Sequence, residues 1–288
     1  MLDIFMVCFI LLATYLYLLQ LSRKTIKNDL IFYLSAVSWG FAIAVKWSAI
    51  FTFIPFTILM SYQQLRFLKN KKLLSYNIKK NLLYGVIPLL IYFITFLPYL
   101  FVEGPYKSSL FDIVFKMPIQ MYHLQQSVSN QHSYRSSWIT WPFMLRPIWY
   151  EYLKAPLKES SFQGVMLLGN PLQMFLGLIS TLLLLFRWEI IKPYSKSFLI
   201  LFVFSWITWS LFQGRPTFFY YFFPSAIIYS FLVPMALEEI FERNNVKKIM
   251  LIFVVLSALL FYYFYPILSG TISPEKIRLQ WYWMSGWI

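Results

Sequence analysis

Residues 249–268 read IMLIFVVLSALLFYYFYPIL, an uninterrupted run without a charged side chain. A helix of about 20 residues rises about 30 Å, which matches the hydrocarbon thickness of a bilayer. Seven more apolar runs precede it, and we predict a helix in each of the eight. They cover approximately residues 2–21, 30–45, 47–63, 82–102, 166–186, 197–213, 217–237 and 249–268. The second and third runs meet at Lys46, as a tight hairpin or as one broken element.

The composition also predicts a chain that lies mostly in lipid. Hydrophobic residues make up 59% of the 288 residues and charged residues 12%, whereas soluble domains are about 25% charged. The formal net charge is +14, but the basic residues gather in short loops, where positive charge orients a membrane protein. We therefore predict no nucleic-acid partner. The single cysteine, Cys8, excludes a disulfide within the chain.

The basic residues predict the orientation of the helices. Fifteen of the 25 Lys and Arg residues lie in four short alternate loops, which we assign to the cytoplasm. These loops hold Arg23, Lys24 and Lys27; Arg66, Lys69, Lys71, Lys72, Lys79 and Lys80; Arg187, Lys192 and Lys196; and Arg243, Lys247 and Lys248. The segment around 103–165, the turn near Arg215 and the tail after Leu268 are then outside. This topology places Met1 outside, with the positive charge after the first run, so we expect further helices upstream; a chain that naturally begins outside is the alternative.

The long outer segment from Glu103 to Asn170 is the natural place for a site. Ser109 and Asp112 have the spacing of a helix-capping box, and apolar residues continue at helical spacing to Leu124. We predict a helix on the outer membrane surface. A helix cap is the favoured role of Asp112, with a catalytic carboxylate as the alternative.

An aromatic and basic stretch, HSYRSSWITWPFMLRPIWYEY, follows from His132 to Tyr152. Aromatic and basic residues gather at membrane interfaces as anchors, but they also stack on sugars and bind phosphate oxygens. His123 and His132 lack the further ligands that zinc needs, so we predict no metal site. Lys46 is a snorkelling lysine or a lipid-phosphate contact, and Arg215, in a short turn without an acid, would suit an external anion.

Several of these motifs resemble one family. QMYH from Gln120, HSYRSSWITWPFMLRPIWYE from His132, LGNP ending at Pro171, GRPTFFYYFFP from Gly214, GFAIAVKW from Gly40 and the initial MLD occur in the order seen in protein O-mannosyltransferases. The resemblance covers essentially the whole chain. It departs from the family at Tyr220-Tyr221, where many members have Tyr-His.

The resemblance implies an all-α polytopic membrane protein of about eight spanning helices, the last eight of an eleven-helix GT-C-like fold with one long outer loop. Three regions follow: 1–103 with the middle helices, 104–165 as the outer loop, and 166–288 as a C-terminal four-helix region with an outer tail. It also implies transfer of mannose from a polyprenyl-phosphate donor to Ser or Thr of proteins. The family's acidic pair, including its presumed base, belongs to an earlier loop, so the catalytic residues stay unknown and we expect the chain alone not to turn over. The outer loop has no room for the soluble domain of eukaryotic members, which favours a bacterial or archaeal plasma-membrane protein.

Seven residues are the candidates for contacts with substrate, and no cofactor is expected. Three cations are candidate phosphate partners, three loop residues are candidate contacts to sugar or acceptor, and one amide is a candidate orienting group. They are Lys46, Arg146 and Arg215; His132, Trp138 and Trp141; and Asn170. The predicted partners are the donor, a protein acceptor and membrane lipid. The alternatives are a related lipid-linked-sugar transferase acting on lipid or cell-wall glycan, and a non-catalytic or transport subunit.

Overall fold

The computed structural model describes residues 2–22, 29–65, 70–104, 108–127, 132–154, 161–212, 216–274 and 279–287. The chain forms two compact units, residues 1–128 and 129–288. The first unit contains the helices α1 (Asp3–Ser22), α2 (Leu30–Val45), α3 (Ile50–Leu65), α4 (Lys71–Ile94) and α5 (Met117–Gln126).

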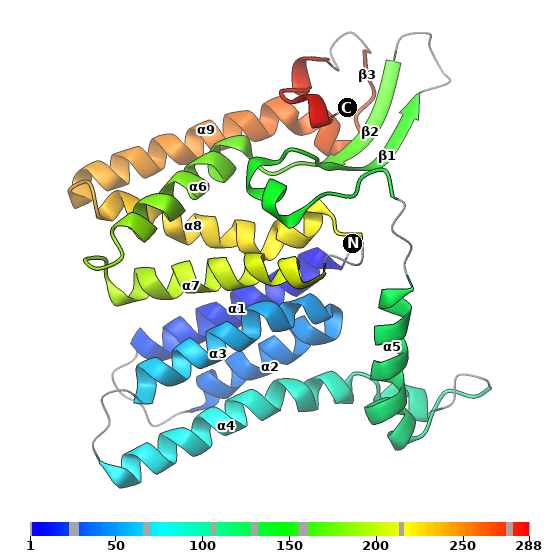
Figure 1. Ribbon diagram of the computed structural model, residues 1–288, viewed down its shortest axis with the longest axis vertical. Coiled ribbons are helices and arrows are strands. Elements are labelled where there is room, and N and C mark those ends of the chain that lie inside the picture. Colours follow the sequence, from blue (N-terminus) through cyan, green and yellow to red (C-terminus); the bar gives the residue numbers. More distant parts are fainter. Residues whose placement is uncertain are drawn as a thin grey trace. The chain divides into compact units, whose positions relative to one another are not determined.

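Helix α2 is the centre of the first unit, because both α1 and α4 pack against it (Figure 1). Ser35 of α2 links all three helices: its Oγ donates to the carbonyl of Ala13 and lies 2.7 Å from the hydroxyl of Tyr84. The close contact of α2 with α4 depends on Gly40, since a Cβ there would lie 2.5 Å from the Cβ of Ile91. Small residues permit such close approach in membrane helices.

The break at Lys46 is a hairpin. Lys46 has an extended backbone, with φ −159° and ψ 125°, and a short 3-10 turn (Trp47–Ala49) leads into α3. The ring of Trp39 in α2 lies 5.5 Å from that of Phe53 and 5.3 Å from that of Phe56 in α3. The chain therefore reverses at Lys46, and the two short apolar runs contact each other through these aromatic rings.

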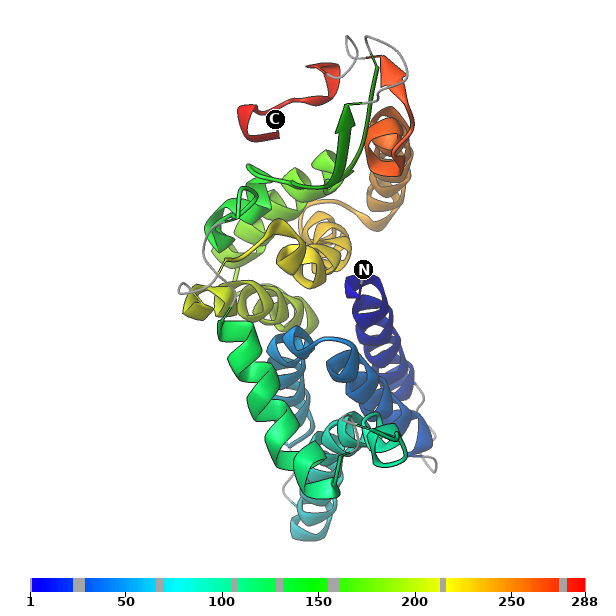
Figure 2. The ribbon, with the colours of Figure 1, turned by 90° about the vertical axis from the view of Figure 1, so that its right-hand side faces the viewer.

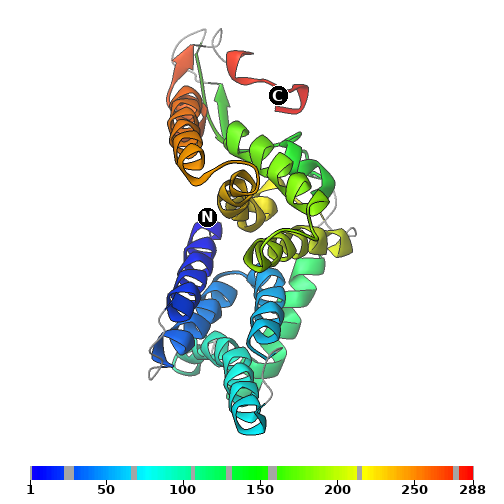
Figure 3. The same cartoon turned by 90° about the vertical axis from the view of Figure 1, so that its left-hand side faces the viewer.

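The second unit contains α6 (Pro171–Phe186), α7 (Pro193–Ile207), α8 (Phe223–Glu238) and α9 (Arg243–Ser269). Figure 3 shows α8 at its centre, in contact with α6, α7 and α9. Gly177 of α6 lies directly against the ring of Tyr229 in α8, where no Cβ would fit. The Tyr229 ring is fully buried and stacks on Phe202 of α7 at 4.8 Å.

The prediction of an all-α chain omitted a three-stranded antiparallel sheet. The strands β1 (Ile148–Lys154) and β2 (Ser161–Leu167) form a hairpin with a bulge near Trp149, and β3 (Ser273–Pro274) pairs with the start of β2. Alternate residues of β2, including Phe162 and Met166, are buried. The hairpin lies beside the end of α9 (Figure 2), and the ring of Trp281 in the C-terminal tail packs on Phe162 at 5.9 Å. Because residues 161–167 form β2, the helix predicted over 166–186 begins only at Pro171, as α6.

The chain is mostly helical, and each of the eight apolar runs contains a helix. In the described parts of the chain, four helices are long and apolar enough to cross a membrane: Asp3–Gln20, Tyr194–Phe212, Phe219–Glu238 and Arg243–Ser269. The apolar helices Leu30–Val45 and Pro171–Phe186 are shorter. Helix α4 begins at Lys71, earlier than its apolar run, so its first turns carry lysines. The total of eight membrane spans stays a prediction.

Candidate functional site

Two distant stretches of the second unit are joined by a pair of hydrogen bonds. The backbone N–H of Ser136 donates to the carbonyl of Thr217 at 2.9 Å, and the Thr217 hydroxyl donates to the carbonyl of Ser136 at 2.8 Å. Both residues are buried. This link brings the aromatic and basic stretch that starts at His132 against the FFYYFF stretch that starts at Phe218.

The two candidate tryptophans have different surroundings. Trp141 is 1% exposed, its Nε1 donates to Ser136 Oγ at 2.9 Å, and its ring packs on Trp209 and Tyr221. Protein therefore covers both faces of this indole. Trp138 is partly exposed and lies edge-on to Trp206, whose Nε1 donates to the Trp138 carbonyl at 2.8 Å. Of the two, Trp138 has the more accessible ring.

The exposed side chain of Arg146 reaches back to the turn that follows His132. Arg146 donates through Nε and Nη2 to the carbonyl of Ser133, at 3.1 and 2.7 Å. His132 Nδ1 accepts the backbone N–H of Tyr134 at 3.2 Å, and its ring lies edge-on to Phe218 at 4.8 Å. An Nδ1 that accepts a hydrogen bond leaves the proton of a neutral imidazole on Nε2. Arg215, the third candidate cation, lies outside the described residues.

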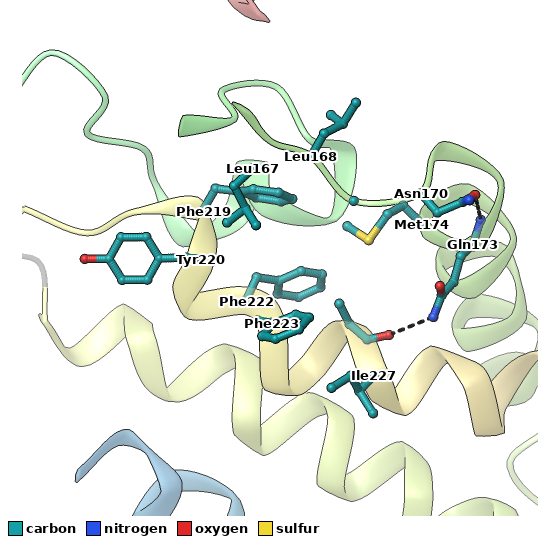
Figure 4. Close-up of a pocket in the computed structure, with 12 residues that line it drawn as sticks. Leu167, Leu168, Asn170, Gln173, Met174, Phe219, Tyr220, Phe222, Phe223 and Ile227 are labelled. Atoms are coloured by element: carbon teal, nitrogen blue, oxygen red, sulfur yellow. Dashed lines mark hydrogen bonds between the residues drawn. The ribbon is translucent and has the colours of Figure 1, made fainter. Parts of the chain in front are cut away.

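A cavity of about 190 Å³ lies between the LGN segment and the FFYYFF stretch (Figure 4). Leu168 and Met174 line one side, and the rings of Phe219 and Phe222 line the other. Gln173 adds an amide that donates to the carbonyl of Ala226 at 3.4 Å and to Ser230 Oγ at 2.9 Å. The cavity is therefore mainly aromatic and aliphatic, with one polar edge.

Asn170 lines the same cavity and begins α6. Its Oδ1 accepts the backbone N–H groups of Leu172 and Gln173, at 3.1 and 3.4 Å, and its Nδ2 donates to the carbonyl of Ser257 in α9 at 2.9 Å. Asparagine followed by proline is a sequence signal for a helix start. Asn170 thus fixes the start of α6 to α9, and this cap determines where Gln173 lies.

Lys46, the remaining candidate cation, belongs to the first unit. Its Nζ lies 2.6 Å from Asp3 Oδ1, and the side chains of Lys46 and Asp3 are 23% and 7% exposed. The neighbouring Trp47 donates from Nε1 to the hydroxyl of Tyr92 at 3.0 Å. The ion pair joins two stretches that the sequence comparison had singled out separately, the MLD start and the GFAIAVKW element.

Two family models match the chain. Residues 1–102 match the model described as dolichyl-phosphate-mannose-protein mannosyltransferase, and residues 110–287 match the C-terminal four-transmembrane region of protein O-mannosyltransferase. The chain belongs to the protein O-mannosyltransferase family. The boundary of the two matches falls before α5, although α5 packs within the first compact unit.

Individual relatives are distant. Dolichyl-phosphate-mannose–protein mannosyltransferase 1 of Saccharomyces cerevisiae is 25% identical over 193 residues, which are 58% of this chain and 23% of that protein. The solved structure of the S. cerevisiae Pmt1–Pmt2 complex bound to the sugar donor matches with a TM-score of 0.48 and 21% identity, over 65% of this chain and 28% of that one. The chain thus spans about a quarter of the length of the curated relative that it matches.

Asp112 has the helix-capping role that the sequence predicted. The backbone N–H and the hydroxyl of Ser109 both donate to Asp112, at 2.9 and 2.7 Å, and the Asp112 N–H returns a bond to the Ser109 hydroxyl. Hydrogen bonding from Lys116, and then from Ser109, holds the pKa of Asp112 well below its usual range. The capping prediction is confirmed. Over the described ranges, no cluster of three or more His, Cys, Asp and Glu could hold a metal ion.

Sequence reasoning did not single out Gln173 or Asp3 as site residues. Gln173 gave a weak signal, since it is a polar residue in the first turn of an otherwise apolar helix. Asp3 was noted as part of a motif, but its partner lies 43 residues further along the chain. Only the packing of α1 on α2 brings them together.

Proposed function

We propose that this protein transfers mannose from a polyprenyl-phosphate donor to Ser and Thr hydroxyls of proteins at the outer face of the plasma membrane. The observation that carries the proposal is the pair of family matches, which together cover residues 1–102 and 110–287. The motifs behind this likeness also converge in space, because the His132 stretch, the LGN segment and the FFYYFF stretch meet in the second unit.

The cavity suits part of such a donor chemically. Its aliphatic and aromatic walls match an apolar lipid chain, and aromatic faces also stack on sugars. The amide of Gln173 supplies the hydrogen bonding that orients a polar group at the edge of an apolar site. In this proposal Trp138 and His132 contact sugar or acceptor, Asn170 positions the cavity wall, and Trp141 supports the cluster from beneath.

The reaction requires a base and a cationic site. The acceptor oxygen attacks the anomeric carbon, the bond from that carbon to the phosphate oxygen breaks, and the hydroxyl proton passes to a carboxylate. The lipid phosphate leaves with the electron pair of the broken bond, and cations stabilise its charge. Lys46, Arg146 and Arg215 are the proposed cations. No carboxylate of this chain is assigned as the base.

Arg146 offers a sharp test. Its guanidinium donates two hydrogen bonds to the Ser133 carbonyl. A lysine at this position would lose this paired contact with the turn, and it could not bind phosphate oxygens in the planar, two-pronged manner of arginine. Mannose transfer to a Ser/Thr-rich peptide is measured with the intact protein in proteoliposomes that contain a polyprenyl-phosphate-mannose donor. We expect Arg146→Lys to lower kcat/KM by about tenfold or more.

Arg243→Lys is the matched control. Arg243 is exposed at the start of α9, on the predicted cytoplasmic side, and should be tolerant. Equal activity of the two variants at equal abundance would remove Arg146 from the site. If mannose were transferred to lipid or glycan but not to peptide, the proposed protein acceptor would be wrong. The related function, transfer to lipid or cell-wall glycan, would take its place.

A further inference from the structure

The ion pair between Asp3 and Lys46 is the best-defined charged contact near the predicted outer ends of the helices in the first unit. Asp3 lies in the first turn of α1, where a carboxylate is favoured by the helix dipole. Asp3 is buried, and the next turn of α1 places the fully buried Met6 beside it along the helix. An aspartate this buried is retained in proteins mainly when a cation accompanies it.

Lys46 is held at both ends. Its backbone closes α2, with its N–H donating to the Ala42 carbonyl at 3.1 Å, and its ammonium reaches Asp3 at 2.6 Å. The four-carbon stem of a lysine is flexible, so an ammonium without a fixed partner samples many positions. The Asp3 carboxylate selects one of them.

We propose that Asp3 is a positioning residue that orients the Lys46 ammonium toward the phosphate of the lipid donor. The proposal rests on the proposed function, because it takes Lys46 to be a phosphate partner. Asp3 contributes direction rather than attraction, since its own negative charge repels the phosphate. The Lys46 side chain is 23% exposed and that of Asp3 is 7% exposed, so an anion would approach this ion pair from the lysine side.

A double-mutant cycle on phosphate binding tests this inference. The probe is polyprenyl phosphate without mannose, and its Kd is measured for the intact protein in nanodiscs with Asp3→Asn, Lys46→Gln and the double variant. We expect Asp3→Asn to weaken binding by about tenfold and to have no further effect in the Lys46→Gln background, because the two residues act as one unit. Asp3→Glu, which keeps the carboxylate, should restore at least part of the affinity.

The thermal midpoint of each variant separates positioning from folding. Unchanged midpoints with weakened binding support the proposal, and so does rescue by Asp3→Glu if Asp3→Asn lowers the midpoint. Tighter binding by Asp3→Asn would overturn it, as would equal weakening in both backgrounds. If Lys46→Gln leaves binding unchanged while mannose transfer continues, the Lys46 assignment and this inference both fail, but the transferase function stands.

Discussion

Asp112 illustrates how a single carboxylate can be assigned from its hydrogen bonds. It accepts two bonds from Ser109 and pairs with Lys116 at 2.6 Å, so its lone pairs serve the start of a helix. We predict that Asp112→Asn keeps mannose transfer within about twofold, whereas loss of a catalytic base costs a factor of about 100 to 10,000. Amide hydrogen exchange of the following turn (Asp112–Lys116) should become faster.

Ser109→Ala is the companion variant for this prediction. It removes the other half of the capping box, so exchange should increase in the same turn while transfer persists. A loss of transfer by two orders of magnitude in Asp112→Asn alone, without faster exchange, would restore the catalytic role.

The residue scale also shows what a sequence can reveal. The cap at Ser109 depends on a neighbour three positions away and was predicted from its motif. The cap at Asn170 was not predicted, although the Asn-Pro dipeptide is a local signal for it. The burial of Trp141 depends on Trp209 and Tyr221, which lie about 70 to 80 positions away. A tryptophan in a mixed aromatic and basic stretch suits a sugar platform and a core equally well, so sequence alone left both roles open.

At the scale of helices, Asp29 ties the start of α2 to the first turns of α4. Its carboxylate pairs with Lys80 and accepts a hydrogen bond from Tyr76. Burial raises the pKa of Asp29, but the hydrogen bonds from Lys80 and Tyr76 and the Lys80 charge outweigh this and hold the pKa below the ordinary 3.8. The bond to Asp29 also raises the pKa of Tyr76 to about 12.

This tether predicts a pH dependence of stability. Because the folded pKa of Asp29 is lowered, its stabilising contribution is complete above pH 3.8 and is lost as the pH falls through the folded pKa. Asp29→Asn should therefore lower the thermal midpoint at pH 7, and the difference from wild type should shrink on acidification below the ordinary pKa. A difference that stays constant down to strongly acidic pH would contradict the assignment of this contribution to the ionised carboxylate.

The close packing of α6 on α8 requires a glycine at position 177. Gly177 faces the fully buried ring of Tyr229, and nothing lies within 4 Å of a Cβ built on Gly85 in α4. We predict that Gly177→Ala destabilises the protein by about 1–3 kcal/mol through overpacking. Gly85→Ala should instead stabilise α4 by about 0.5–1 kcal/mol, because alanine favours the helix. Unfolding in detergent compares the two, and equal effects would refute the close α6–α8 contact.

The helices were predictable as elements, and the sheet was not. A helix can be predicted from the apolar run that forms it, because its hydrogen bonds are local. The sheet depends on distant residues, since β3 lies more than 100 residues after β2, with which it pairs. The β1 stretch has the Trp and Tyr content of a strand, but the same residues are typical of a membrane interface. Interpreting them as an interface anchor favoured an all-helical chain.

At the scale of the whole molecule, the distribution of charge predicts which ends of the helices face the cytoplasm. Lys71 opens α4 on the predicted inner side, and Ser137 precedes the buried Trp141 on the predicted outer side; both are exposed. In a Cys8→Ser background, which removes the single native cysteine, each position is replaced in turn by cysteine. We expect a membrane-impermeant maleimide to label position 137 on intact cells, and position 71 only after permeabilisation. Ser137 suits this test better than Trp141, since a cysteine in the buried aromatic cluster would stay unlabelled on either side. Labelling of position 71 from outside intact cells would reverse the assignment and would place the proposed site on the wrong face of the membrane for acceptors outside the cell.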